Sequence, residues 1–127
     1  MATESQSPQL GALSGVIDLY YNQALELARS GSLAEARDTL AAVLTLEPQA
    51  VDAHIVLGKV HAQMDTYDHA MASWRNALEL EEGNTAALQG IATAQRMLRR
   101  QTRLRSLWRA GGGASVALVF VLGVLAA

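Results

Sequence analysis

The residues best suited to chemistry are the histidines and the paired carboxylates. His54 and His61 are seven positions apart, about 10.5 Å along a helix, so the pair is too widely spaced to hold one metal ion. His69 follows eight positions later without a motif around it, and the adjacent Glu81 and Glu82 stand where a helix is expected to end. The chain has no cysteine, which excludes disulfides, thiolate metal sites and a cysteine nucleophile. The sequence therefore predicts a protein that is not an enzyme and uses no metal or cofactor, which leaves binding.

Charge is divided strongly along the chain, although the net charge is only -2. Residues 1–83 hold all 12 acidic residues and four of the 10 basic ones, whereas residues 84–127 hold six arginines and no acid. Such asymmetry indicates that one end faces an anionic surface, either lipid headgroups or nucleic acid.

Composition and periodicity predict an all-α fold. Aromatic residues make up only 5% and prolines number two, which suits helices better than sheets. The sequence also repeats with a period of 34, since small residues align with small ones and large apolar residues with large apolar ones. The aligned sets are Ala24 with Gly58 and Ala92, Ala36 with Ala70, and Leu40 with Trp74.

Each repeat is expected to form two helices. The first unit has helices at about 14–30 and from Ser32 to about Glu47, the latter opened by a capping box of Ser32 with Glu35. The second has helices at about 50–64 and 67–81. A further helix starts after Asn84, caps the second unit and continues to Arg109.

This pattern resembles the tetratricopeptide repeat family over about residues 17–109. The second unit matches it with Leu57, Gly58, Ala70, Trp74 and Ala77, and the first with Tyr20, Ala24, Ala36, Leu40 and Pro48. The second unit departs from it at His54 and His61, where bulky aromatics are usual, and at Glu82, which replaces a proline. The resemblance implies two units plus a capping helix in residues 14–95, and a protein partner bound on the face lined by the first helix of each unit. The groove residues that the resemblance implies are Asp18, Tyr21, Leu25, Asp52, Ile55, Lys59, Gln89 and Thr93.

The C-terminal 32 residues predict contact with a membrane. Residues 110–127 carry no charge and would span about 27 Å as a helix, at the short limit for a transmembrane segment. A buried or partner-facing helix and a re-entrant or interfacial segment are the alternatives. Before this tail, residues 96–109 are expected to form a basic juxtamembrane helix. We expect its arginines to contact anionic headgroups rather than nucleic acid. The residues expected at the membrane interface are Arg99, Arg100, Arg103, Arg105, Trp108 and Arg109.

The expected topology is a single-pass membrane protein with its N-terminal domain in the cytoplasm. Arginines stand on the N-terminal side of the apolar tail and none stands beyond it. Residues 1–13 lack the basic and apolar regions of a secretory signal and predict a flexible arm. Arginine outnumbers lysine nine to one, which favours a bacterial source.

Two functions remain in view. The first is a membrane-anchored scaffold or adaptor whose repeats mediate protein–protein interactions. The second is a permanent accessory subunit of a larger integral membrane complex of the respiratory or photosynthetic type, whose tail packs on other transmembrane subunits. A peripheral lipid or nucleic-acid binder driven by the arginines ranks behind both.

Overall fold

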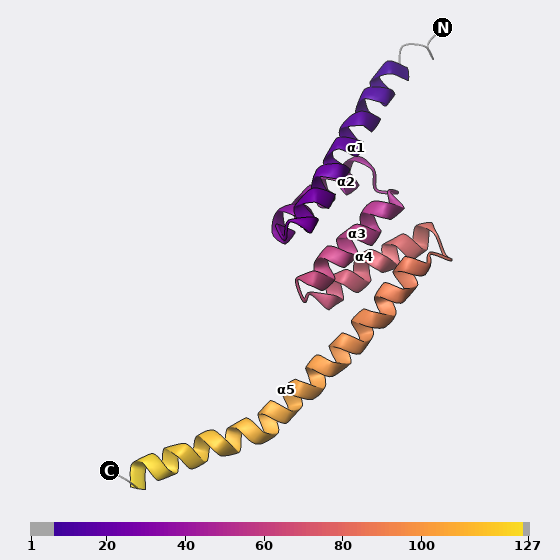
Figure 1. Ribbon diagram of the computed structural model, residues 1–127. Coiled ribbons are helices and arrows are strands. Elements are labelled where there is room, and N and C mark those ends of the chain that lie inside the picture. The colour runs from indigo at the N-terminus through magenta and orange to yellow at the C-terminus, as the bar shows by residue number, and fades with distance from the viewer. Residues whose placement is uncertain (1–6, 126–127) are drawn as a thin grey trace. The chain divides into compact units, whose positions relative to one another are not determined.

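The structure, a computed structural model, describes the backbone of residues 7–125 and the side-chain environments of residues 9–111. Every element in the described part is a helix, as Figure 1 shows, so the expectation of an all-α fold is confirmed. The elements in chain order are α1 Ser7–Arg29, α2 Leu33–Leu46, α3 Val51–Gln63, α4 Tyr67–Leu80 and α5 Thr85–Leu125.

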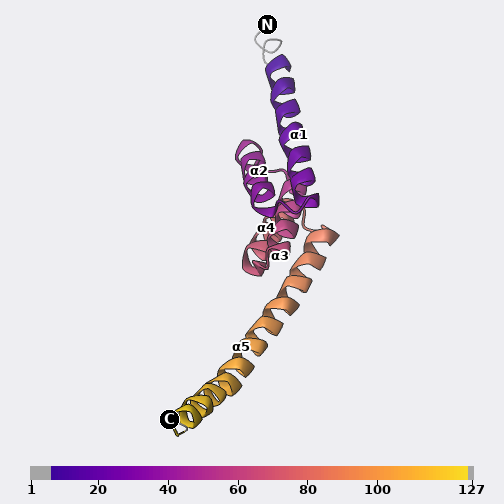
Figure 2. The ribbon, with the colours of Figure 1, turned by 60° about the vertical axis from the view of Figure 1, so that its left-hand side comes forward.

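The first four helices form two hairpins. α1 packs against α2 and α3 against α4, while α2 joins the hairpins by packing against α3 (Figures 1 and 2). The chain divides into two compact units, residues 1–94 and residues 95–127, and α5 runs through the division. Helices α2, α3 and α4 end within about one residue of the expected positions.

The turn inside each hairpin has the same backbone conformation. Gly31 has φ +87°, and the amide of Ser32 donates to the carbonyl of Leu27 at 2.9 Å. Thirty-four positions later Asp65 has φ 59°, and the amide of Thr66 donates to His61 at 2.9 Å. This left-handed residue ends the helix and satisfies its last carbonyls. Glycine adopts it without a steric penalty, whereas aspartate tolerates it at a cost.

The expected helix caps form at one site and fail at another. Asn84 Oδ1 accepts a hydrogen bond from the amide of Ala87 at 3.0 Å, which caps the start of α5. The capping box predicted from Ser32 and Glu35 is wrong, because Ser32 makes no side-chain cap hydrogen bond. Its hydroxyl lies 3.5 Å from that of Ser30 instead.

α1 begins earlier than the sequence indicated. The expected flexible arm covers residues 1–13, but the helix already includes residues 7–13, which corrects that part of the prediction. Pro8 lies in the first turn, where its missing amide hydrogen would have had no helical partner. Residues 1–6 of the arm lie outside the described residues.

Small and branched aliphatic side chains form the core of the first hairpin and its contact with α3. Ala24 and Ala36 are fully buried where α1 meets α2, and Leu40 fills the space beside them. Val43 and Val60 extend the same cluster. Deleting a buried leucine from such a core removes both transfer free energy and packing.

A tryptophan between two glycines holds the second hairpin to the first turns of α5. Trp74 of α4 is 4% exposed, and its Nε1 donates to the backbone carbonyl of Ile55 at 3.2 Å. A Cβ atom placed on Gly58 of α3 or on Gly90 of α5 would lie under 3.0 Å from the indole. The two glycines therefore give the ring the room it occupies. Ala87 and Ala94 of α5 are also buried, which confirms that this segment covers core.

The described residues contain no helix that is both long enough and apolar enough to cross a bilayer. The backbone of α5 remains helical to Leu125. The predicted transmembrane segment, residues 110–127, has nearly all its side chains outside the described residues.

Candidate partner-binding groove

Two hollows are lined by successive turns of α1 and α3, and we call them together the groove. The first is an acidic hollow of about 450 Å³. α1 and α3 form the two walls, and the residues that line each wall are three or four positions apart, so that they share one face of the helix. The hollow has apolar residues beneath and four carboxylates around them. Its lining consists of Ile17, Asp18, Tyr21, Val43, Glu47, Gln49, Ala50, Val51, Asp52, Ala53 and Glu81.

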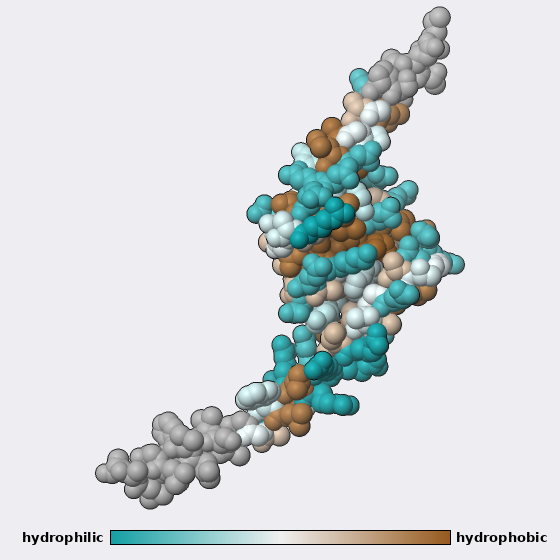
Figure 3. Space-filling model, viewed as in Figure 1, coloured by the Kyte–Doolittle hydropathy of each residue, from teal (hydrophilic) through white to brown (hydrophobic). Residues whose placement is uncertain are grey.

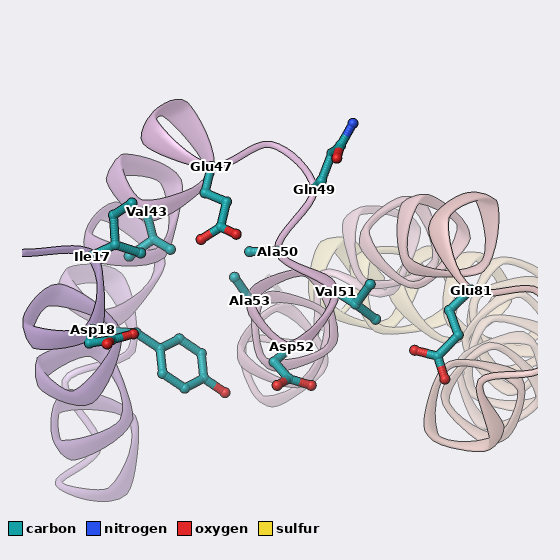
Figure 4. A pocket seen from close by; sticks show the side chains of 11 residues that line it. Ile17, Asp18, Val43, Glu47, Gln49, Ala50, Val51, Asp52, Ala53 and Glu81 are labelled. Carbon is teal, nitrogen blue, oxygen red and sulfur yellow. The ribbon is translucent and has the colours of Figure 1, made fainter. Parts of the chain in front are cut away.

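The four carboxylates come from four different helices or helix ends. Asp18 lies on α1 and Asp52 on α3, while Glu47 and Glu81 follow the last residues of α2 and α4 (Figure 4). Figure 4 shows the Glu47 side chain reaching from the end of α2 toward Ala50. Within the described residues none of the four forms an ion pair, and the hollow has no lysine, arginine or histidine in its lining. The hollow is thus a site of uncompensated negative charge.

Tyr21 supplies a phenol at the wall of the acidic hollow. Burial, and then the negative charge of Asp52, raise the pKa of Tyr21 above its ordinary value of 10.0. Both causes favour the neutral phenol. At neutral pH its hydroxyl is therefore a hydrogen-bond donor to any acceptor that enters the hollow.

The second half of the groove, the middle hollow, has a basic character. It has a volume of about 200 Å³ and is lined by Leu25, Ala28, Arg29, Val56, Lys59, Val60 and Gln63. Arg29 pairs with Glu26 at 2.6 Å on the exposed surface of α1. Lys59 forms no ion pair among the described residues, so it is the uncompensated charge of this half.

A third hollow, the tryptophan hollow, lies between α3 and the first turns of α5. It has a volume of about 430 Å³ and is lined by Lys59, Ala62, Gln63, Trp74, Ala86, Gln89, Gly90 and Thr93. Lys59 lines both this hollow and the middle one.

The structure places the sequence-predicted groove residues unevenly. Asp18, Tyr21 and Asp52 come together in the acidic hollow, Leu25 and Lys59 in the middle hollow, and Lys59, Gln89 and Thr93 in the tryptophan hollow. Ile55 differs from the prediction, because its side chain is only 7% exposed and lines none of these hollows. The backbone carbonyl of Ile55 accepts the hydrogen bond from the Trp74 indole, so this position of α3 lies beside a buried ring.

Sequence reasoning missed Glu47 and Glu81 as groove residues. Both follow the last residue of a helix, and both align in the 34-residue repeat. The shared position was visible in the sequence, but the direction of a side chain beyond a helix end depends on the turn that follows it.

The histidines of the second hairpin lie away from the groove. His61 and His69 stack with ring centroids 5.2 Å apart, and Nδ1 of His61 is 3.1 Å from the hydroxyl of Thr66. Burial, then the charges of His69 and Arg37, lower the pKa of His61 below 6.5. In the part of the chain that the structure describes, no three histidine or acidic side chains are grouped so that they could hold a metal ion.

The arginine segment of α5, residues 96–109, forms a separate exposed surface. All six residues expected at the membrane interface are exposed, and Trp108 is 76% exposed. Arg96, Arg99, Arg100 and Arg103 line one hollow of about 250 Å³. Figure 3 shows teal polar and brown apolar side chains side by side in this segment, where Leu104 and Leu107 are exposed. The segment thus offers cations and apolar side chains together.

Comparison with known proteins shows the fold and leaves the family open. No protein-family model matches the chain, and no curated protein matches it. Two crystal structures of MamA are similar. One has a TM-score of 0.64 at 20% identity over 73% of this chain and 51% of that chain, and the other has 0.53 at 16% identity over 68% and 61%. The chain therefore spans about half to three-fifths of these structures. It has an all-helical, tetratricopeptide-like fold of paired helices similar to that of MamA.

Proposed function

We propose that this chain is a membrane-anchored interaction scaffold, in which the helical repeats bind a partner protein and the C-terminal segment inserts into a bilayer. The groove between α1 and α3 carries the proposal. It combines apolar walls with uncompensated charges at Asp52 and Lys59, and it is open to solvent. Repeat proteins bind other proteins on extended surfaces that combine charged and apolar groups. We therefore interpret the groove as a binding surface rather than as a catalytic centre.

The arginine segment supports attachment to an anionic membrane surface. Arg99 and Arg103 are one helical turn apart, as are Arg105 and Arg109, and such like-charge pairs destabilise a helix by roughly 0.2–0.5 kcal/mol each. Residues 84–127 contain no acid that could offset this repulsion. Anionic headgroups would offset the repulsion between the arginines. Each arginine near such headgroups contributes on the order of 1 kcal/mol to membrane binding. Trp108 would lie at the same depth, where tryptophan is favoured.

The tail supplies the anchor in this proposal. Residues 110–127 carry no charge, and the backbone of α5 is helical as far as Leu125. With the arginines on its N-terminal side, the positive-inside rule directs the repeats to the cytoplasm in a single-pass arrangement.

Insertion is tested by placing charges in the tail. We expect Val119→Asp with Val121→Asp to move the protein from the membrane fraction to the soluble fraction in high salt, since each charge near a bilayer centre costs about 2.5–3.5 kcal/mol. Gln23→Asp with Asn76→Asp, at two exposed positions of the repeats that line none of the described hollows, is the matched control and should leave the protein on membranes. A double tail variant that still resists high salt would contradict the anchor.

Sidedness can be measured because the chain has no cysteine. Ala72→Cys, on the exposed surface of α4, should react with a membrane-impermeant maleimide only in vesicles whose cytoplasmic face is outward. Reaction in vesicles of the opposite orientation would place the repeats on the other side.

Partner binding is tested by crosslinking from the groove wall. A photoreactive phenylalanine at position 21 should crosslink a protein in native membranes, whereas the same group at position 20, which is 41% exposed and lines none of the described hollows, should not. Equal crosslinking from both positions would count against the groove.

The accessory-subunit role remains the second candidate, and the exposed Leu104, Leu107 and Trp108 beside the tail favour it. Apolar side chains there could pack on a neighbouring subunit as well as on lipid. Stoichiometric migration with a large complex after mild solubilisation would select this role over a transient adaptor.

A further inference from the structure

Charge changes sign along the groove between α1 and α3. Its acidic half has Asp18 of α1 and Asp52 of α3 in its lining, together with Glu47 and Glu81. Its other half has Lys59. Asp52 and Lys59 are seven residues apart on α3, which is two helical turns or about 10 Å. A ligand that lies along α3 therefore meets negative charge first and positive charge about 10 Å further on.

The acidic hollow has the two surfaces that a long basic side chain requires. Arginine and lysine bury an apolar stem while their charged heads stay at the polar rim. Ile17, Val43 and Ala53 line the hollow with apolar atoms, and the carboxylates stand at its edge without a cation among the described residues. A volume of about 450 Å³ leaves room for one such side chain together with part of the backbone that bears it.

We infer that the groove binds a segment of another protein that places an arginine or lysine in the acidic hollow and a carboxylate about 10 Å further along, at Lys59. The inference rests on the proposed function and adds the chemistry of the partner. Asp18 and Asp52 bind the basic head, the phenol of Tyr21 donates to a backbone carbonyl of the segment, and Lys59 fixes the direction in which the segment lies. Anionic lipid is excluded as the occupant of the acidic hollow because like charges repel there.

A short peptide of matched geometry tests the inference. In a polyproline II helix, side chains three residues apart lie on one side at a separation of about 9 Å. The probe is therefore acetyl-Arg-Pro-Pro-Glu-amide, titrated into the 127-residue chain in detergent micelles, with the dissociation constant measured by NMR. Two further peptides replace the arginine with citrulline or the glutamate with glutamine.

Removing one charge of a partly exposed pair should weaken binding roughly five-fold. We expect this loss for Asp52→Asn and for the citrulline peptide, and we expect no further loss when the two are combined. Lys59→Gln should couple in the same way to the glutamine peptide. Asp68→Asn is the control, because it removes one exposed negative charge from the turn side of α4, outside the groove lining.

Three outcomes would overturn the inference. The first is equal binding of the arginine and citrulline peptides. The second is equal weakening by Asp52→Asn and Asp68→Asn, which would mean that long-range attraction to the acidic domain, and no local pairing, holds the peptide. The third is self-association of the chain that Asp52→Asn abolishes, because the occupant would then be the arginine segment of a second copy.

The failures of the two proposals are distinguishable. A chain that crosslinks a partner from position 21 but ignores the charge of the peptides is a scaffold with a different ligand chemistry. A chain that crosslinks nothing from position 21, and fails to bind any of the three peptides, contradicts the scaffold function itself.

Discussion

The two hairpins fill the same space between paired helices with different side chains. In the first, Ala24 of α1 faces Leu40 of α2, and in the second the aligned positions are Gly58 of α3 and Trp74 of α4. The larger ring is matched by a smaller neighbour, and a second glycine, Gly90, accommodates its other side. The packing between the two helices of a hairpin is therefore kept as a shared volume, while the individual residues differ.

The hairpins also differ in polar groups near their turns. Leu27 in the first hairpin corresponds to the half-buried His61 in the second, and Gly31 corresponds to Asp65. The second hairpin thus has a titratable ring and a strained turn residue where the first has a leucine and a glycine. Its stability should depend on pH and on the fit around Trp74 more than that of the first.

The largest effect should come from truncating Trp74 and Leu40, the large residues at the same position of the two hairpins. We expect Trp74→Ala to lower the free energy of unfolding by about 3–5 kcal/mol and Leu40→Ala by about 2–5 kcal/mol, because both leave cavities in a close-packed core. Trp74→Ala also leaves the Ile55 carbonyl without its indole donor. Urea unfolding of the full chain in micelles, followed by helical circular dichroism, measures both. A loss under about 1 kcal/mol for Trp74→Ala would contradict its place between the glycines.

A smaller effect should follow from adding a methyl group beside the indole. Gly58→Ala should destabilise by about 1–3 kcal/mol through overpacking, partly offset by better helix propensity. Gly83→Ala is the control, since nothing lies within 4 Å of a Cβ at Gly83.

Coupling between the two positions sharpens the comparison. Gly58→Ala with Trp74→Leu reproduces the pair found in the first hairpin, so the double variant should lose less stability than the two single variants summed. Additive losses would show that the hairpins do not share one packing rule.

The smallest effect concerns pH. Burial lowers the pKa of His61 in the folded chain, so as pH falls through 6.5 the unfolded state takes up the proton first. The stability present above that pH is then lost as pH drops further. His61→Leu, which installs the residue of the first hairpin, should flatten the dependence of the melting temperature on pH between about 5 and 7. An unchanged slope would assign the pH dependence to another group.

The helical pairs were predictable from the sequence because a 34-residue spacing of small and large residues fixes which faces meet. Trp74 and Gly58 matched the tetratricopeptide pattern, and both lie in the core as expected. The beginning of α1 was not predictable in this way. The sequence predicts a flexible arm for residues 1–13, but the helix includes Pro8, which removes no helical hydrogen bond within a first turn.

The tetratricopeptide resemblance implies Asp18, Tyr21 and Asp52 as groove residues, and all three line the acidic hollow. Their places on α1 and α3 are set by helical spacing, which can be read from the sequence. Ile55 is only 7% exposed instead, and it lies beside Trp74, a residue 19 positions away in sequence that helical position within α3 alone does not reveal. Glu47 and Glu81 escaped assignment because each follows a helix end, where the fold of the next loop decides the direction of the side chain.

The two tryptophans differ so strongly in exposure that their intrinsic fluorescence can report on two parts of the chain separately. Trp74 is 4% exposed and Trp108 is 76% exposed. Acrylamide in solution should quench the emission of Trp108 and leave a blue-shifted signal from Trp74 that follows unfolding of the repeats. If lipid vesicles shield Trp108 from the quencher, a single emission spectrum then separates membrane contact from folding, without any label added to the protein.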